Sequence, residues 1–224
     1  MGLAVVSPEA FVHALDGAHS LQLSAYTLGS ATQGASRVIA ALEAAADRGA
    51  DVHVRLESNP YDPSGAGGLA QANRDAVGAL RAHGVDATLS DDPNAPLHMK
   101  AAIVDGTLFL NDRNWPDSGE VTIVTTRDAD DVETVRKAFD GEHAVDGHLA
   151  TWKRRALELE VDTIHYAPPG AVDVETESFG PGIVLDALAA RLRAGDPVRL
   201  LVAARDLAGN AREAGALRQL AAAG

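Results

Sequence analysis

A histidine and a lysine stand two residues apart, at His98 and Lys100, at the start of a largely apolar stretch that ends at Trp115. Side chains alternate between the two faces of a strand, so this spacing predicts that the imidazole and the ammonium share one face. An ammonium binds phosphate oxygens, and an imidazole can attack phosphorus or transfer a proton. The pair therefore indicates chemistry on an anionic phosphate, which needs no metal ion.

A tight hairpin is predicted directly after this pair. Two short apolar runs flank Asp105-Gly106, which is a strong signal for a two-residue turn between antiparallel strands. The returning strand would bring Asn114 alongside His98 and Lys100. Its amide could then donate a further hydrogen bond to a phosphate oxygen.

The spacing His98-x-Lys100-x4-Asp105 resembles the HxKx4D signature of the phospholipase D superfamily. That family usually continues with Gly-Ser-x-Asn, and Asn114 matches its asparagine. Asp112 stands where the family has serine, which removes a neutral donor and adds negative charge near the phosphate. The resemblance implies that His98 attacks phosphorus and that Lys100 and Asn114 bind the phosphate.

Glu120 matches the acidic residue that follows the asparagine in this family, where it orients the catalytic histidine. A carboxylate on one imidazole nitrogen fixes the tautomer and leaves the other nitrogen to react. The same resemblance implies that Asp105 supports the hairpin and is not a catalyst. The expected catalytic residues are His98, Lys100 and Glu120, and the expected substrate-binding residues are Lys100 and Asn114.

Composition limits the choice of substrate and location. The chain has 224 residues, 46% of them hydrophobic, and a net charge of −13. Such an acidic balance disfavours a protein that holds nucleic acid mainly by neutralising phosphates, so a phospholipid is the favoured substrate. No apolar run approaches the roughly 20 residues that span a bilayer, and the N-terminus lacks the basic region of a secretory signal, so we expect a cytoplasmic protein. There is no cysteine, which excludes disulfides and thiolate metal sites, and no cofactor is expected.

Helical and strand-like segments alternate along the first half of the chain, which is typical of α/β proteins. The resemblance implies a mixed β-sheet sandwiched between helix layers, as in phospholipase D. Polar residues rich in Gly and Pro at 57–68 lack the Lys-Ser/Thr of a P-loop, so nucleotide binding is not favoured. The predicted helices are 8–15, 37–49, 70–83, 131–139 and 150–159. The predicted strands are 21–26, 52–56, 85–89, 101–104, 107–110 and 120–124.

The C-terminal part repeats the helix-then-strand pattern of the first part. Such a repeat indicates a duplicated supersecondary unit, although any two βαβ units share some of this pattern. The matching segments are 38–42 with 184–188 and 52–56 with 198–202, both 146 residues apart, and 77–84 with 217–224 and Tyr26 with Tyr166, both 140 residues apart.

This repeat predicts three parts of the chain. Residues 1–147 form a first lobe with the motif, 148–160 a connecting helix, and 161–224 a partial second lobe without a motif. The resemblance implies that two motifs meet, one histidine forming a phosphohistidine and the other protonating the leaving oxygen. The second motif is expected either from a homodimer partner or from a missing C-terminal part, and the partial second lobe favours the latter.

Three functions follow from these features. The first is a phosphodiesterase or phosphatidyltransferase of the phospholipase D type that acts through a phosphohistidine at His98. A nuclease of the same superfamily is the second. Because Asp112 replaces the family's serine and only one motif is present, the third is an inactive lobe with a binding or scaffold role.

Overall fold

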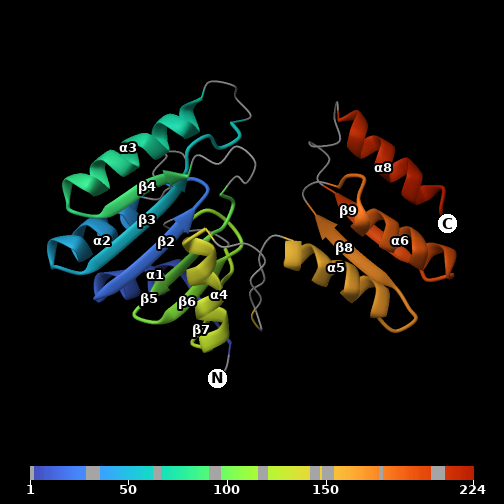
Figure 1. Ribbon diagram of the computed structural model, residues 1–224, viewed down its shortest axis with the longest axis horizontal. Coiled ribbons are helices and arrows are strands. Elements are labelled where there is room, and N and C mark those ends of the chain that lie inside the picture. Colours follow the sequence, from blue (N-terminus) through green and yellow to red (C-terminus); the bar gives the residue numbers. More distant parts are fainter. Residues whose placement is uncertain are drawn as a thin grey trace. The chain divides into compact units, whose positions relative to one another are not determined.

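The computed structural model describes residues 3–28, 36–62, 67–90, 97–115, 121–141, 147, 154–176, 179–202 and 210–224. The chain divides into two compact units, Met1–Thr151 and Trp152–Gly224 (Figure 1). Within the described ranges, none of the helices combines the length and apolar character that crossing a bilayer requires.

A mixed seven-stranded sheet forms the centre of the first unit, in the order β1-β7-β6-β5-β2-β3-β4. Strands β2, β3 and β4 are mutually parallel, and each of the remaining neighbours pairs antiparallel. The strands are β1 (Ala4–Val6), β2 (Ser20–Ala25), β3 (Asp51–Glu57), β4 (Asp86–Ser90), β5 (Ala101–Val104), β6 (Thr107–Asn111) and β7 (Ile123–Thr126).

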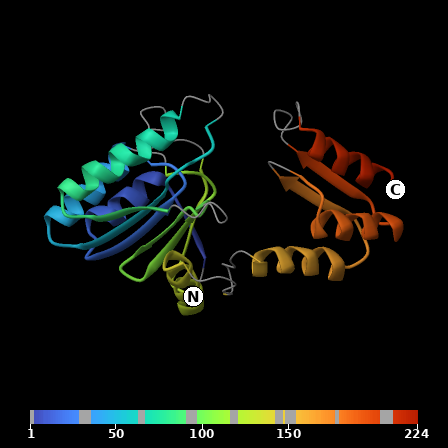
Figure 2. The same ribbon diagram turned by 45° about the horizontal axis from the view of Figure 1, so that its top comes forward.

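Helices cover both faces of this sheet (Figures 1 and 2). Apolar residues of α1 (Pro8–Asp16), α2 (Ser36–Asp47) and α3 (Gly68–Ala82) share one core with the inward residues of β2 and β3. Helix α4 (Ala129–Phe139) contacts β5 and β6 from the opposite face. The predicted fold class, a mixed sheet between helix layers, is therefore confirmed.

Local sequence signals set the helix starts. The Ser7 hydroxyl accepts a hydrogen bond from the amide of Ala10 at 3.3 Å, and Pro8 occupies the first turn of α1, where its missing amide costs nothing. The Asp128 carboxylate likewise accepts from the amides of Asp130 and Asp131 at the start of α4. The predicted helices at 8–15 and 131–139 are accordingly confirmed.

The segment that carries the histidine and lysine enters the sheet at the C-terminal ends of β2 and β3. Strand β5 is antiparallel to β2, with Ala101 opposite Ser24, so residues 97–100 lie at that end. The prediction of a strand through His98 is wrong, because β5 begins at Ala101. Burial still alternates as expected: Leu97 and Met99 are each 6% exposed, whereas His98 is exposed and Lys100 half-buried.

The second unit has a two-stranded parallel sheet of β8 and β9. Its helices and strands are α5 (Arg154–Tyr166), β8 (Val172–Thr176), α6 (Ile183–Arg193), β9 (Val198–Val202) and α8 (Ala211–Ala221). The helix predicted to connect the lobes continues well past residue 160, to Tyr166. Matching Tyr166 with Tyr26 is therefore wrong, because Tyr166 ends a helix and β8 follows it.

The order β2-α2-β3-α3 recurs as β8-α6-β9-α8. Both strand pairs are parallel, and Val198 pairs with Val172 as Val52 pairs with Leu21. Helix α5 packs on α6 as α1 packs on α2. Both α2 and α6 are followed by a glycine with positive φ, Gly49 at 89° and Gly195 at 90°. The order and the pairing of the elements thus recur between these two parts of the chain.

Candidate active site

The imidazole of His98 and the ammonium of Lys100 lie against each other. Lys100 Nζ is 2.9 Å from Nδ1 and 3.0 Å from Nε2 of His98, and it donates to the carbonyl oxygen of His98 at 2.8 Å. The ammonium therefore lies within hydrogen-bond distance of the ring and is held there by the backbone of the same residue. An imidazole nitrogen that carries no proton can accept from the ammonium or act as a nucleophile.

Tyr26, which directly follows β2, forms one wall of the site. Its ring centroid is 4.6 Å from that of His98, with the rings at 64°, and Lys100 Nζ lies 5.5 Å from the tyrosine centroid. The ammonium is thus within cation–π range of the ring. The sequence singled out Tyr26 only as a marker of the repeat. Its place at the C-terminal end of a parallel strand was the signal for a site residue.

Asn114 is fixed by the residue next to that tyrosine. Its Oδ1 accepts a hydrogen bond from the amide of Thr27 at 3.2 Å, and the side chain is half-buried. This bond assigns the carbonyl side of the amide to the backbone and leaves Nδ2 as the donor. Trp115 Nε1 donates to the carbonyl oxygen of Ser24 at 3.0 Å, which anchors the same segment on β2. Asn114 and His98 thus contact adjacent residues at one end of β2.

The carboxylate of Asp112, which stands at the family's serine position, has backbone and side-chain partners. Its Oδ1 accepts from the amide of Thr122 at 3.1 Å, and Oδ2 lies 3.9 Å from Nε of Arg113. The Asp112 amide also donates to the carbonyl oxygen of Thr122 at 3.2 Å. These contacts occupy the carboxylate in the connection between β6 and β7 and offset part of its charge.

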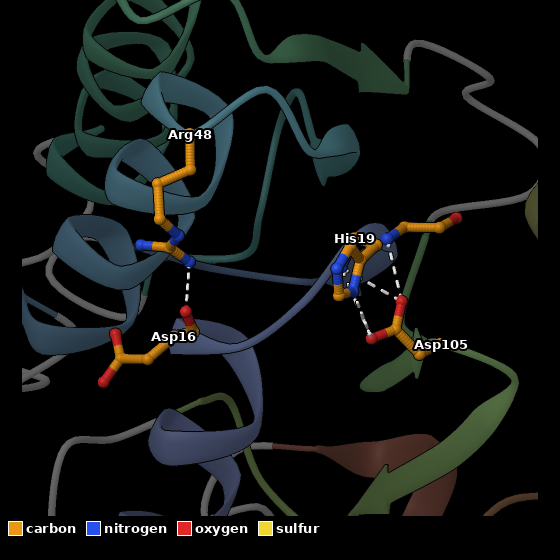
Figure 3. Close-up of polar contacts among 5 residues, drawn as sticks. Asp16, His19, Arg48 and Asp105 are labelled. Atoms are coloured by element: carbon orange, nitrogen blue, oxygen red, sulfur yellow. Dashed lines mark hydrogen bonds and ion pairs between the residues drawn. The ribbon is translucent and has the colours of Figure 1, made fainter.

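Asp105 lies at the opposite end of β5 from His98. Asp105 and Gly106 have φ of 45° and 74°, as in the predicted two-residue turn. The carboxylate accepts from the amides of Ser20 at 2.9 Å and His19 at 3.1 Å, with the His19 ring 3.6 Å away (Figure 3). The hydrogen bond from the Ser20 amide, more than that from His19, lowers the pKa of Asp105 below its ordinary value. This position fits a support for the hairpin.

Glu120 lies outside the described residues, so its expected role in orienting the imidazole stays a prediction. Within the described ranges, no group of three histidine or acidic side chains could hold a metal ion.

Two buried polar residues near the site were not predicted from the sequence. Glu57, the last residue of β3, is 5% exposed, and Asn73 in α3 is 0% exposed. Asn73 falls at helical spacing in the buried stripe that includes Ala70, Ala76 and Leu80, where an apolar residue is the norm. Two sequence features could have pointed to these residues. Asn73 is a polar residue within an apolar helical stripe, and Glu57 is an acidic residue directly after the apolar positions of a predicted strand.

No family model matches the chain, and no curated protein matches it. Among solved structures, a polyphosphate kinase from Porphyromonas gingivalis is similar with a TM-score of 0.60 and 20% identity, covering 90% of this chain and 34% of the kinase. A phosphatidylserine synthase from Haemophilus influenzae has a TM-score of 0.61 and 11% identity, covering 89% of this chain and 61% of the synthase.

A third similar structure is the phospholipase D family member Nuc from Salmonella typhimurium, with a TM-score of 0.49 and 22% identity, covering 62% of this chain and 92% of Nuc. The chain spans about a third of the length of the polyphosphate kinase and 61% of the synthase. These likenesses concern the fold. On that level the expected α/β fold is confirmed, because this chain shares it with the polyphosphate kinase and the phosphatidylserine synthase.

Proposed function

We propose that this protein cleaves or transfers a phosphodiester through a phosphohistidine at His98. The observation that supports the proposal most is the contact between the Lys100 ammonium and both nitrogens of the exposed His98 ring. The pair lies at the C-terminal ends of parallel strands, where α/β sheets commonly bind ligands.

In the proposed reaction, a neutral His98 nitrogen attacks phosphorus, a P–N bond forms and the bond to the leaving oxygen breaks. Lys100 moves from the ring to the non-bridging phosphate oxygens, and Asn114 Nδ2 donates to them, so both stabilise the charge that develops. The expected role of Glu120 in this reaction is to orient the imidazole. Water or an alcohol then attacks the phosphohistidine, which releases the product and restores the imidazole.

An alkoxide leaving group also needs a proton, which a second motif would supply. The sequence contains a single HxK, so the complete reaction on an ordinary substrate requires another motif-bearing lobe. We propose that it comes from a second chain or from a further part of a longer protein.

A phospholipid is the proposed substrate. The net charge of −13 disfavours the extended phosphate contacts that nucleic acid binding requires, whereas a single head-group phosphate needs only a local cation such as Lys100. A nuclease and a binding lobe without turnover remain as outcomes that the experiments below distinguish.

Bis(p-nitrophenyl) phosphate tests the reaction without a second motif, because nitrophenolate leaves as a stable anion and needs no proton. We expect the full chain to release nitrophenolate, and His98→Asn to lose the release. His13→Asn changes an exposed histidine of α1 and serves as the matched control. Release by His98→Asn at the native rate would contradict the proposal.

The substrate class is tested by offering phospholipid in mixed micelles and single-stranded oligonucleotide to the same chain. Hydrolysis of the phospholipid, lost in His98→Asn, supports the proposed substrate. Hydrolysis of the oligonucleotide instead would assign the nuclease. Saturable binding of either ligand without any turnover, even of the nitrophenyl ester, would assign the scaffold role.

A further inference from the structure

The carboxylate of Glu57 joins two chain segments behind the candidate active site. Its Oε2 accepts a hydrogen bond from the amide of Leu97 at 2.6 Å, across 40 residues of sequence. Its Oε1 accepts from the amide of Asn59 at 2.9 Å and from the hydroxyl of Ser58 at 3.4 Å. A buried carboxylate is tolerated only with such partners, so three donors from two segments are committed to it.

Asn73 fixes the strand ends to which that carboxylate belongs. Its Nδ2 donates to the carbonyl oxygens of Glu57 at 2.8 Å and of Tyr26 at 2.9 Å. Its Oδ1 accepts from the amide of Leu28 at 3.0 Å. The single amide therefore holds the C-terminal ends of β2 and β3 at a fixed separation from inside the core.

These bonds lead directly to the reactive pair. Leu97 immediately precedes His98, and residues 97–100 lie outside any strand, so the carboxylate binds an amide that a neighbouring strand would otherwise take. From the other side, the ring of Tyr26 lies against His98 and its hydroxyl accepts from the amide of Tyr61. The imidazole of His98 thus follows a backbone amide that Glu57 binds. It also contacts the ring of Tyr26, whose carbonyl oxygen accepts a hydrogen bond from Asn73.

We propose that Glu57 is a positioning residue for His98, acting through the Leu97 amide, with Asn73 keeping Glu57 and Tyr26 in register. The inference rests on the proposed function of His98. Glu57 is itself buried, so in this proposal it acts on the substrate only through the position of His98. It sets the direction in which the imidazole meets phosphorus, and displacement of a reacting group by a fraction of its contact distance lowers the rate far more than the affinity.

The test is Glu57→Gln in the full chain with bis(p-nitrophenyl) phosphate as the probe. Glutamine keeps the shape but has one acceptor oxygen, so its amide NH2 must face a backbone amide in place of the second oxygen. We expect kcat to fall by about 10- to 100-fold with KM within about 3-fold of its native value. Val54→Ala, a core change in the same strand, should lower thermal stability and leave kcat within about 3-fold.

Three results would overturn the inference: native kcat in a folded Glu57→Gln, an equal loss of kcat in Val54→Ala, or a loss confined to KM. His98→Asn is assayed in parallel. If His98→Asn keeps the activity, the proposed function has failed. If His98→Asn is inactive and Glu57→Gln is fully active, only the positioning role has failed.

Hydrogen exchange of the native chain provides a measurement that does not depend on the variant's folding. An amide bound to a buried carboxylate is protected, so we expect the Leu97 amide to exchange at least about 100-fold more slowly than in an unstructured peptide. Exchange at the unstructured rate would exclude the Leu97–Glu57 bond and, with it, the inference.

Discussion

A βαβα segment occurs twice in this chain, and the candidate active site lies next to its first copy. β2-α2-β3-α3 and β8-α6-β9-α8 share element order and parallel pairing. The first copy is extended by the β5–β6 hairpin, which pairs with β2 and brings the segment with His98 and Lys100 to the end of that strand. The two segments thus share one backbone arrangement, and the residues of the candidate active site lie in the hairpin region that follows the first of them.

The two copies also differ on the outer face of their sheets. In the first, Arg55 is half-buried and donates to the carbonyl oxygen of Phe139 in α4 at 2.7 Å. In the second, the residue at the position of Arg55 is Leu201, which is 64% exposed, beside the surface ion pair of Arg199 with Asp173. The same backbone pattern therefore supports a covered face in one copy and an exposed one in the other.

One buried position differs in chemistry between the copies. Asn73 of α3 corresponds to Glu213 of α8, 140 residues later, and the two are 0% and 5% exposed. All the polar atoms of Asn73 make hydrogen bonds, whereas Oε2 of Glu213 has no partner within the described residues. Among the described residues, the buried side chain at this position binds two strand ends in the first copy, whereas in the second copy it has one oxygen without a partner.

Of three substitutions that test this comparison, removal of the Asn73 side-chain amide should lower the free energy of unfolding most. Asn73→Leu leaves the amide of Leu28 and the carbonyl oxygens of Tyr26 and Glu57 buried without this partner. We expect the free energy of unfolding of the first unit to fall by about 3 kcal/mol. Hydrogen exchange of the full chain, followed separately in β2–β3 and in β8–β9, measures it. A loss under about 1 kcal/mol, or equal loss in both units, would show that the amide is not the tie described here.

Asp105→Asn tests how the hairpin is attached to the repeated segment. The pKa of Asp105 is lowered in the folded state, so its stabilisation is present above the ordinary value of 3.8 and is lost as pH falls through the folded value. We expect Asp105→Asn to lower the free energy of unfolding by about 1 kcal/mol at pH 7, a small loss because the side chain is 43% exposed. Below about pH 4 this loss should become smaller. Denaturant unfolding at both pH values measures it, and a cost that grows in acid would contradict it.

Glu213→Gln should change the free energy of unfolding least. Removing a desolvated charge favours folding, and losing an anion in the first turn of α8 opposes it, so the two effects offset each other. We expect a change of less than about 1 kcal/mol in the second unit by the same exchange measurement. A loss as large as that of Asn73→Leu would mean that both copies use this position alike.

Periodicity and capping signals were sufficient to predict α1 to α4 and β2 to β4, because these elements have regular apolar faces. Two strands lack the regular apolar face on which these predictions depend. Strand β1 has only three residues, and in β8 the exposed Asp173 and Glu175 alternate with residues that are only half-buried. Tyr166 was misplaced because Val161 and Ile164 continue the helical stripe of α5 past the expected boundary.

Motif spacing pointed to His98 and Lys100, whose side chains contact each other. It also pointed to Asn114, which binds the amide of Thr27 at the end of β2. Glu57 and Asn73 could not be found in this way. The bonds that connect them to other segments span 16 to 47 residues and depend on how β2, β3 and α3 pack. The strand expected at His98 is also absent because of a contact between distant segments. The amide of Leu97 donates to the side chain of Glu57 in β3 and not to a neighbouring strand.

The most direct test of the account is to identify the residue that becomes phosphorylated. The full chain is mixed with bis(p-nitrophenyl) phosphate, quenched within the first turnover at alkaline pH, where phosphohistidine is stable, and mapped by peptide mass spectrometry. We predict one nitrophenyl phosphate group on the imidazole of His98, absent from His98→Asn. An adduct on any other residue, or nitrophenolate release with no adduct at His98 under these conditions, would contradict the central claim.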